Sequence, residues 1–279
     1  GTQVYNAAAG AFVPLGMLDV MQIFGRAGRP QFDSLGEGVI ITARDQLEHY
    51  LQLMTHQLPI ESRFDKQLAD HLNAEIVLGT VASVDDACTW LRYTYLYQRM
   101  AQNPLVYGLT PLDVELDPHL AAHCRALVTS AARTLDAAKM IRFDARLGSL
   151  HATDLGRTAS HYYIEHHTIE EFNTRLRDTM TEEGVLALVA HASEFAQIRV
   201  RDEEQAELDA LQSRCPVDIR GEDGPHSKVN VLLQAYLSNE PLEAFALVSD
   251  SAYIAQNASR IVRGLFEIAL KRGWSSLAL

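Results

Sequence analysis

The spacing of hydrophobic positions changes twice along the chain and divides it into three stretches. Over residues 1–57, short apolar runs are mixed with helical spacing, which predicts part of an α/β domain. The runs at 3–5 and 11–13 flank a stretch of small residues and predict a β-hairpin. The run GVIIT at 38–42 predicts a short buried strand, and residues 45–53 predict a helix.

Residues 58–154 combine helices with a second hairpin. Ser83, followed three residues later by Asp86, predicts the start of a helix that runs to about Met100. Four large side chains repeat along that helix and predict one buried face: Trp90, Tyr93, Tyr97 and Met100. A second helix and two short strands are predicted to follow, at 118–138, 140–143 and 149–153. Helices followed by a β-hairpin are typical of a winged helix.

Residues 155–279 show helical spacing throughout and predict an all-α bundle. The expected helices lie at 154–166, 168–178, 182–192, 201–214, 228–238 and, with breaks, 242–271. The polar stretch 215–227, which contains Gly and Pro, predicts a loop.

The composition is that of an ordinary globular protein, and the apolar runs and cysteines indicate the kind of compartment in which it works. Hydrophobic residues make up 47% and charged residues 22% of the 279 positions. The longest apolar runs are too short to span a bilayer, and no leader sequence is expected at the start. Three widely spaced cysteines, Cys88, Cys124 and Cys215, fit a reducing compartment and argue against structural zinc.

A net charge of −12 argues against a protein that coats nucleic acid, because such binding depends on neutralising phosphates. A channel with a few arginines can still bind a strand while the outer surface stays acidic. The acidic excess is concentrated at 201–207, which predicts a solvated helix. Arg260, Arg263 and the pair 271–272 instead make the last helix basic.

Residues 22–29 form the pattern Q-x-x-G-R-x-G-R, the most informative feature of the chain. Arg26 and Arg29 are three apart, so on a helical turn both guanidiniums could reach one target. A guanidinium is permanently charged and binds phosphate oxygens in pairs, which makes a nucleotide phosphate the expected target. The alternative is a surface helix with two solvated arginines.

The pattern resembles motif six of superfamily-two helicases, and the stretches around it resemble the Ski2-like branch. The residues before it, GTQVY at 1–5 and LDVM at 18–21, resemble the end of motif five and the approach to motif six. Further stretches agree with the branch, namely 73–76 (NAEI), 90–96 (WLRYTYL), 103–108 (NPLVYG), 154–163 (DLGRTASHYY) and 251–260 (SAYIAQNASR). The resemblance covers nearly the whole chain.

The resemblance implies a mixed fold in three parts. These are the carboxyl-terminal part of the second RecA-like α/β domain at 1–57, a winged helix at 58–154 and an all-α helical ratchet domain at 155–279. It implies an ATP-dependent DNA or RNA helicase with 3′–5′ translocation, working in the nucleus and cytosol with other protein subunits and with no membrane. The implied site residues near the nucleotide are Gln22, Arg26 and Arg29, and Thr2 would touch nucleic acid.

ATP and Mg²⁺ would be bound mainly by residues that this chain lacks. The sequence contains no G-x-x-x-x-G-K-[ST] loop to hold phosphates, so the chain alone is expected to be inactive. Residues 202–205 (DEEQ) resemble a magnesium-binding box, but they do not follow an apolar strand. His161, His166 and His167 are spaced poorly for a shared metal, so no metal site is expected. The alternative function is a non-catalytic helicase cassette that docks partner proteins.

A second candidate site is a polar stripe on the last helix. Five polar or aromatic residues repeat at helical spacing there: Tyr253, Gln256, Asn257, Arg260 and Arg263. Ile254, Ile261, Leu265 and Ile268 are predicted to form the opposite, buried face. A ring, amides and guanidiniums suit single-stranded nucleic acid, because stacking and phosphate contacts do not depend on base sequence. The alternative is an ordinary exposed helix face.

Overall fold

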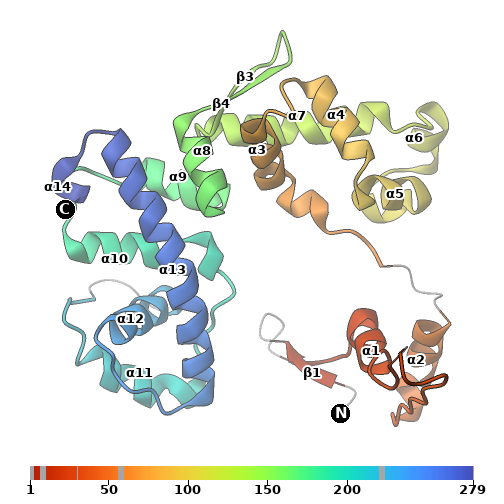
Figure 1. The fold of residues 1–279 in the computed structure, drawn as a ribbon, viewed down its shortest axis with the longest axis horizontal. Coiled ribbons are helices and arrows are strands. Elements are labelled where there is room, and N and C mark those ends of the chain that lie inside the picture. The colour runs from red at the N-terminus through yellow and green to blue at the C-terminus, as the bar shows by residue number, and fades with distance from the viewer. Residues whose placement is uncertain (1–2, 7–10, 30, 56–59, 220–223, 279) are drawn as a thin grey trace. The chain divides into compact units, whose positions relative to one another are not determined.

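The computed structural model describes residues 3–6, 11–29, 31–55, 60–219 and 224–278. The chain forms two compact units, Gly1–Glu61 and Ser62–Leu279 (Figure 1). Among the described residues, no helix has both the length and the apolar character needed to cross a bilayer.

The first unit contains a hairpin and short helices. Strands β1 (Gln3–Asn6) and β2 (Ala11–Pro14) pair antiparallel, with Gln3 opposite Pro14 and Asn6 opposite Ala11, which confirms the predicted hairpin. The other elements are α1 (Met17–Phe24), the 3₁₀ turn η1 (Arg44–Gln46) and α2 (Leu47–Met54). Val20 of α1 and Tyr50 of α2 form a small buried core.

The predicted strand at 38–42 is not formed. Val39 is 82% exposed and Ile41 is 87% exposed, and neither belongs to a strand. A buried strand needs neighbouring strands to accept its hydrogen bonds, and the described residues of this unit supply only the β1–β2 pair. The apolar run therefore has no regular secondary structure.

The first half of the second unit consists of helices followed by a β-hairpin. The elements are η2 (Phe64–Gln67), α3 (Leu68–Leu78), α4 (Val84–Arg92), α5 (Tyr95–Gln102), η3 (Pro104–Tyr107), α6 (Pro111–Leu116), α7 (Ala121–Ala137), β3 (Ile141–Asp144) and β4 (Ser149–Ala152). Ile141 lies opposite Ala152 and Asp144 opposite Ser149. The predicted winged-helix order of helices followed by a hairpin is confirmed.

The helix predicted from Ser83 to Met100 is divided into α4 and α5. Ser83 caps α4 as expected, because its hydroxyl accepts the Asp86 N–H at 3.2 Å. Thr94 then starts a new helix by accepting the Tyr97 N–H at 3.4 Å. Tyr93 is 88% exposed at the break, so the four large side chains do not share one buried face.

The second half of this unit is all-helical, as predicted. Its elements are α8 (Asp154–Tyr162), α9 (His166–Arg175), α10 (Glu182–Ala190), η4 (Ser193–Phe195), η5 (Asp202–Glu204), α11 (Gln205–Gln212), α12 (Pro225–Leu237), α13 (Phe245–Lys271) and α14 (Ser275–Ala278). Helix α13 runs unbroken for 27 residues, contrary to the expected breaks, and packs against α8, α10 and α12 (Figure 1).

One hydrophobic core runs through both halves of the second unit, and their junction is tightly packed. Buried Asn73 of α3 donates its amide N–H to the Gly156 carbonyl of α8 at 3.0 Å. The α8 backbone also lies against the start of β3. A Cβ atom on Gly156 would be 2.0 Å from the Met140 carbonyl oxygen, so only glycine permits this approach.

A second link between the halves joins His166 of α9 to Asp70 of α3. The Asp70 carboxylate accepts the His166 backbone N–H at 2.7 Å and lies 3.0 Å from the ring Nδ1. The hydrogen bond to Asp70 raises the pKa of His166 against the opposing effect of burial. Histidine 166 is thus structural, and no group of three or more metal-binding side chains lies together in the described parts of the chain.

We expect this pair to make stability depend on pH. Because the folded pKa of His166 is raised, the stabilisation is fully present below the ordinary value of 6.5 and is lost as pH rises through the raised pKa. Chemical denaturation of the wild type and of Asp70→Asn between pH 5 and 9 should show a difference on the order of 1 kcal/mol that shrinks with rising pH. The control is His151→Gln at an exposed position of β4. A difference that does not change with pH would contradict the assignment.

The acidic run at 202–205 is only partly solvated, contrary to the sequence prediction. Glu204 is buried, and its carboxylate accepts a 2.6 Å bond from the fully buried Lys228 ammonium of α12. Lys228 also donates to the Arg199 carbonyl at 2.9 Å and to Asp250 of α13 at 2.7 Å. Burial acts to raise the pKa of Glu204, but bonds from Lys228 and Arg201 outweigh it and lower the pKa. The cluster is a structural link rather than a magnesium site.

Candidate functional site

The polar stripe on α13 has the predicted amphipathic arrangement. Ile254, Ile261, Leu265 and Ile268 are all buried, which confirms the expected apolar face. Gln256 and Arg263 lie exposed on the other side and make no hydrogen bond or ion pair with the described residues. These two side chains are therefore available to an external ligand.

Arg260 is engaged inside the protein. Its Nη1 donates to the carbonyls of Tyr162, at 3.3 Å, and of Tyr163, both at the end of α8. Its Nε and Nη2 donate to the Asn257 amide oxygen at 3.1 and 2.7 Å. Arg260 and Asn257 thus act as one hydrogen-bonded group that fixes the end of α8 against α13.

The Tyr253 ring does not project freely from the stripe. Its hydroxyl donates to the Glu194 carbonyl at 2.9 Å, and its ring meets the Phe195 ring edge-on at 6.5 Å between centroids. Burial raises the pKa of Tyr253. The structure therefore gives the expected stacking residue a packing contact within the bundle.

A carboxylate lies beside this group. The Glu194 side chain is buried, with Oε1 3.7 Å from the Arg260 Nη1. It accepts a 2.5 Å bond from the Thr168 hydroxyl and a 3.0 Å bond from the Glu165 N–H. Burial raises the pKa of Glu194. Part of the Arg260 charge is therefore balanced internally, whereas that of Arg263 is not.

Sequence reasoning missed Tyr163, which lies next to this stripe. It caps α8 with φ 54° and ψ 44°, and its side chain is 82% exposed. Helical periodicity could not identify it, because the residue falls where the helix ends. At this exposure the Tyr163 ring is not a packing residue.

The motif-six arginines do not share one helical turn, contrary to the prediction. Helix α1 ends at Phe24, and the next backbone bonds, from Arg26 to Ile23 and from Ala27 to Phe24, have the tight spacing of a final turn. Arg29 precedes a proline in the sequence, a position that disfavours helix. Gln22 remains on α1, and Thr2 lies outside the described residues.

Close backbone contacts hold the segment that carries the arginines. Arg29 donates its backbone N–H to Asp33 at 2.9 Å, and its guanidinium carbon lies 5.5 Å from the centre of the Phe32 ring. A Cβ atom on Gly36 would lie 3.0 Å from the Ala27 carbonyl oxygen. Both arginines of this segment, Arg26 and Arg29, are exposed. Gln22, on the helix before it, is exposed as well.

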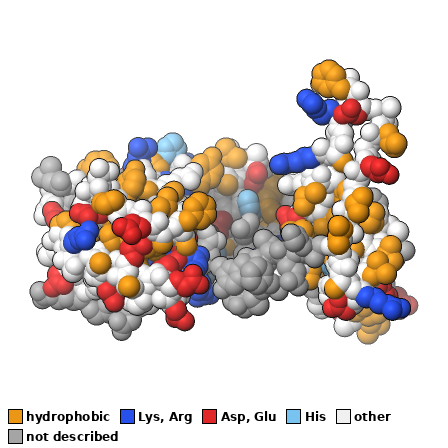
Figure 2. Space-filling view, turned by 90° about the horizontal axis from the view of Figure 1, so that it is seen from below, with side chains coloured by type: hydrophobic (Ala, Val, Ile, Leu, Met, Phe, Trp, Pro, Cys, Tyr) orange, Lys and Arg blue, Asp and Glu red, His pale blue; other side chains and the backbone are white. Residues whose placement is uncertain are grey.

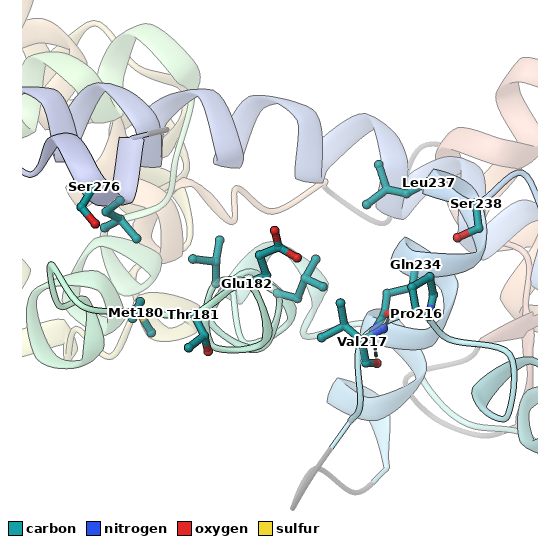
Figure 3. A pocket seen from close by; sticks show the side chains of 12 residues that line it. Met180, Thr181, Glu182, Pro216, Val217, Gln234, Leu237, Ser238 and Ser276 are labelled. Carbon is teal, nitrogen blue, oxygen red and sulfur yellow. Dashed lines mark hydrogen bonds between the residues drawn. The ribbon is translucent and has the colours of Figure 1, made fainter.

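A pocket of about 510 Å³ lies elsewhere in the bundle, between α10, α12 and α14 (Figure 3). Its wall is mainly apolar and includes Val185, Leu186 and Leu237. The Gln234 amide closes one side by bonding both the N–H and the carbonyl of Val217, at 2.9 and 3.0 Å. None of the stripe residues lines it.

The surface charge agrees with a local rather than a general contact to nucleic acid. On the face drawn in Figure 2, Lys and Arg side chains lie scattered among acidic and hydrophobic ones, with no broad basic area among the residues described there. A few cations in a defined path fit this surface better than coating of a polyanion.

Comparison with known proteins agrees with this architecture. The family described as "Winged Helix-turn-helix domain" matches residues 61–145, and that described as "Sec63 Brl domain" matches residues 152–279. Activating signal cointegrator 1 complex subunit 3 of Bos taurus is 56% identical over 279 residues, 99% of this chain and 13% of that protein. The DExH-box ATP-dependent RNA helicase DExH14 of Arabidopsis thaliana is 53% identical over 283 residues, again 13% of its length. The chain thus spans about an eighth of these relatives.

Proposed function

This chain belongs to the Ski2-like family of superfamily-two helicases, and on that premise we propose that it is part of an ATP-dependent enzyme that unwinds DNA or RNA. The observation that carries the proposal is the identity of more than half over the whole chain with a protein named as an ATP-dependent RNA helicase. The enzyme would translocate 3′–5′ in the nucleus and cytosol, as one subunit of a larger complex.

In this proposal residues 1–57 complete a RecA-like domain whose other strands belong to the longer protein. Gln22, Arg26 and Arg29 are exposed, and no ion pair with a described residue occupies either guanidinium, which fits a role on the ATP phosphates. The described residues hold no cluster of carboxylates for Mg²⁺. Bound ATP would supply the energy of translocation, and the metal would be held mainly outside this chain.

The strand would pass along the polar stripe of α13. Gln256 and Arg263 would contact it directly, and Arg260 and Asn257 would hold the end of α8 beside it. Thr2 would make a further backbone contact from the first unit. Amide and guanidinium contacts of this kind grip a strand without selecting its sequence.

We expect the double variant Gln256→Ala/Arg263→Ala to weaken single-strand binding about 10-fold and to slow unwinding in the full-length helicase. The melting temperature should change little, because exposed polar substitutions shift stability by no more than about 0.5 kcal/mol. Arg260→Ala should lower both affinity and melting temperature, since its carbonyl bonds to α8 are lost. Fluorescence anisotropy and calorimetry would measure these effects. Arg199→Ala, at another exposed position of the bundle, is the control.

Unchanged affinity and unwinding in the double variant would exclude this path for the strand. The alternative function, a non-catalytic cassette that docks partner proteins, would then be favoured. Exposed hydrophobic side chains on α13 support that alternative, since Phe245 is 86% exposed and Phe266 is 49% exposed.

A further inference from the structure

The last residue of the α8 cap has an unusual backbone for its type. Tyr163 has φ 54° and ψ 44°, in the left-handed region that glycine or asparagine normally occupies at a helix end. The next residue completes the cap, because the Ile164 N–H donates to the Ala159 carbonyl at 2.9 Å. A bulky residue here costs stability without helping the cap. Its side chain therefore needs another explanation.

The Tyr163 ring is not used in packing. The side chain is 82% exposed and has no ring contact or side-chain hydrogen bond within the described parts of the chain. Ile164, by contrast, is buried against Gly264 of α13, where a Cβ atom would be 2.3 Å from its Cδ1. The chain is thus anchored immediately after Tyr163 while the ring stays in solvent.

Contacts with α13 fix the backbone that carries this exposed ring. The Tyr163 carbonyl accepts from the Arg260 guanidinium, which Asn257 also holds. Exposed Arg263 comes one turn later on the same helix. An exposed aromatic side chain is therefore carried on a backbone fixed against the cation-bearing stripe. The carboxylate beside Arg260, that of Glu194, is buried and accepts a hydrogen bond from the Thr168 hydroxyl.

We propose that Tyr163 is a stacking platform for one nucleobase of the single strand that runs along α13. The proposal rests on the helicase function and adds the residue that contacts a base. A ring with a fixed backbone loses little entropy when a base stacks on it, and every base offers a π face. The ligand is a nucleobase of RNA or DNA. Arg263 would bind the phosphates of the same strand.

The test uses the full-length helicase with Tyr163→Gly, Tyr163→Phe and the control Tyr93→Ala, which removes another highly exposed tyrosine. The probes are single-stranded RNA and DNA oligonucleotides and an abasic strand of equal length. We expect Tyr163→Gly to weaken binding of the base-containing strands about 10-fold and to leave the abasic strand unaffected. Tyr163→Phe and Tyr93→Ala should bind like the wild type. A loss on RNA only or on DNA only would identify the strand type.

Melting temperature separates stacking from a structural role. Glycine suits the left-handed cap, so Tyr163→Gly should keep or raise the melting temperature while affinity falls. Unchanged affinity for all strands, or an equal loss on the abasic strand with a lower melting temperature, would overturn the proposal. If Gln256→Ala/Arg263→Ala still weakens binding in that case, the helicase path stands without Tyr163.

Discussion

Replacing either Arg26 or Arg29 with alanine in the full-length helicase is expected to lower ATP turnover by about 10³-fold, with a much smaller change in nucleic-acid affinity. The γ-phosphate gains charge in the transition state, and a guanidinium placed against it stabilises that charge. Both arginines are exposed, on a segment held by the close approach of Gly36 to Ala27. Their placement thus depends on backbone packing rather than on a shared helical turn.

Steady-state ATPase assays with saturating single-stranded nucleic acid would measure the effect. Arg29→Lys should not restore turnover, because an ammonium cannot present the two-pronged guanidinium geometry. Arg44→Ala removes another exposed arginine from the same unit and should behave like the wild type. Turnover near wild type in both alanine variants would exclude a role at the nucleotide.

Gly156→Ala is expected to lower the free energy of unfolding of the second unit by about 3 kcal/mol or more. The new methyl group would be 2.0 Å from the Met140 carbonyl oxygen and 2.8 Å from the Asn73 side-chain oxygen. Two backbone segments would have to separate, which would also break the bond from Asn73 to the Gly156 carbonyl.

A closely matched control exists in the same unit. Gly184 occupies the same position of α10 as Gly156 does of α8, since Thr181 and Thr153 each accept the glycine N–H at the third helical residue. A Cβ atom on Gly184 would make only ordinary contacts, with the flexible Met180 side chain at 3.4 Å and the Thr181 hydroxyl oxygen at 3.7 Å. Gly184→Ala should therefore be neutral or stabilise by up to about 1 kcal/mol. Equal melting temperatures for the two variants would show that the junction relaxes easily.

Local signals in the sequence predicted much of the second unit. The Ser83 cap, the β3–β4 hairpin and the buried face of α13 all depend on neighbouring residues in the chain, and all are confirmed. The break before Thr94 was missed because a threonine inside a helical pattern can either cap a new helix or continue the old one. Burial of Glu204 was missed because its partner Lys228 comes from another helix.

The first unit was predicted less well, because its structure also depends on residues that are not neighbours in the sequence. The periodicity of residues 38–42 describes a strand, but a strand forms only where neighbours pair with it. The end of α1 at Phe24 depends on Gly25 and on the packing of later glycines, which local pattern does not encode. The Tyr163 cap was missed likewise, because its geometry is set by Arg260 about a hundred residues later.

The contacts of Asp70 and Asn73 with α8 and α9 restrict how this part of the protein can evolve. Sequence families place one module at 61–145 and another at 152–279, as if each were exchangeable. The fold does not permit such an exchange, because the α3 helix of the first module completes the core of the second. A winged helix grafted from another helicase would have to bring its own partners for Gly156 and His166. Replacing either module alone is therefore expected to destabilise the junction between them.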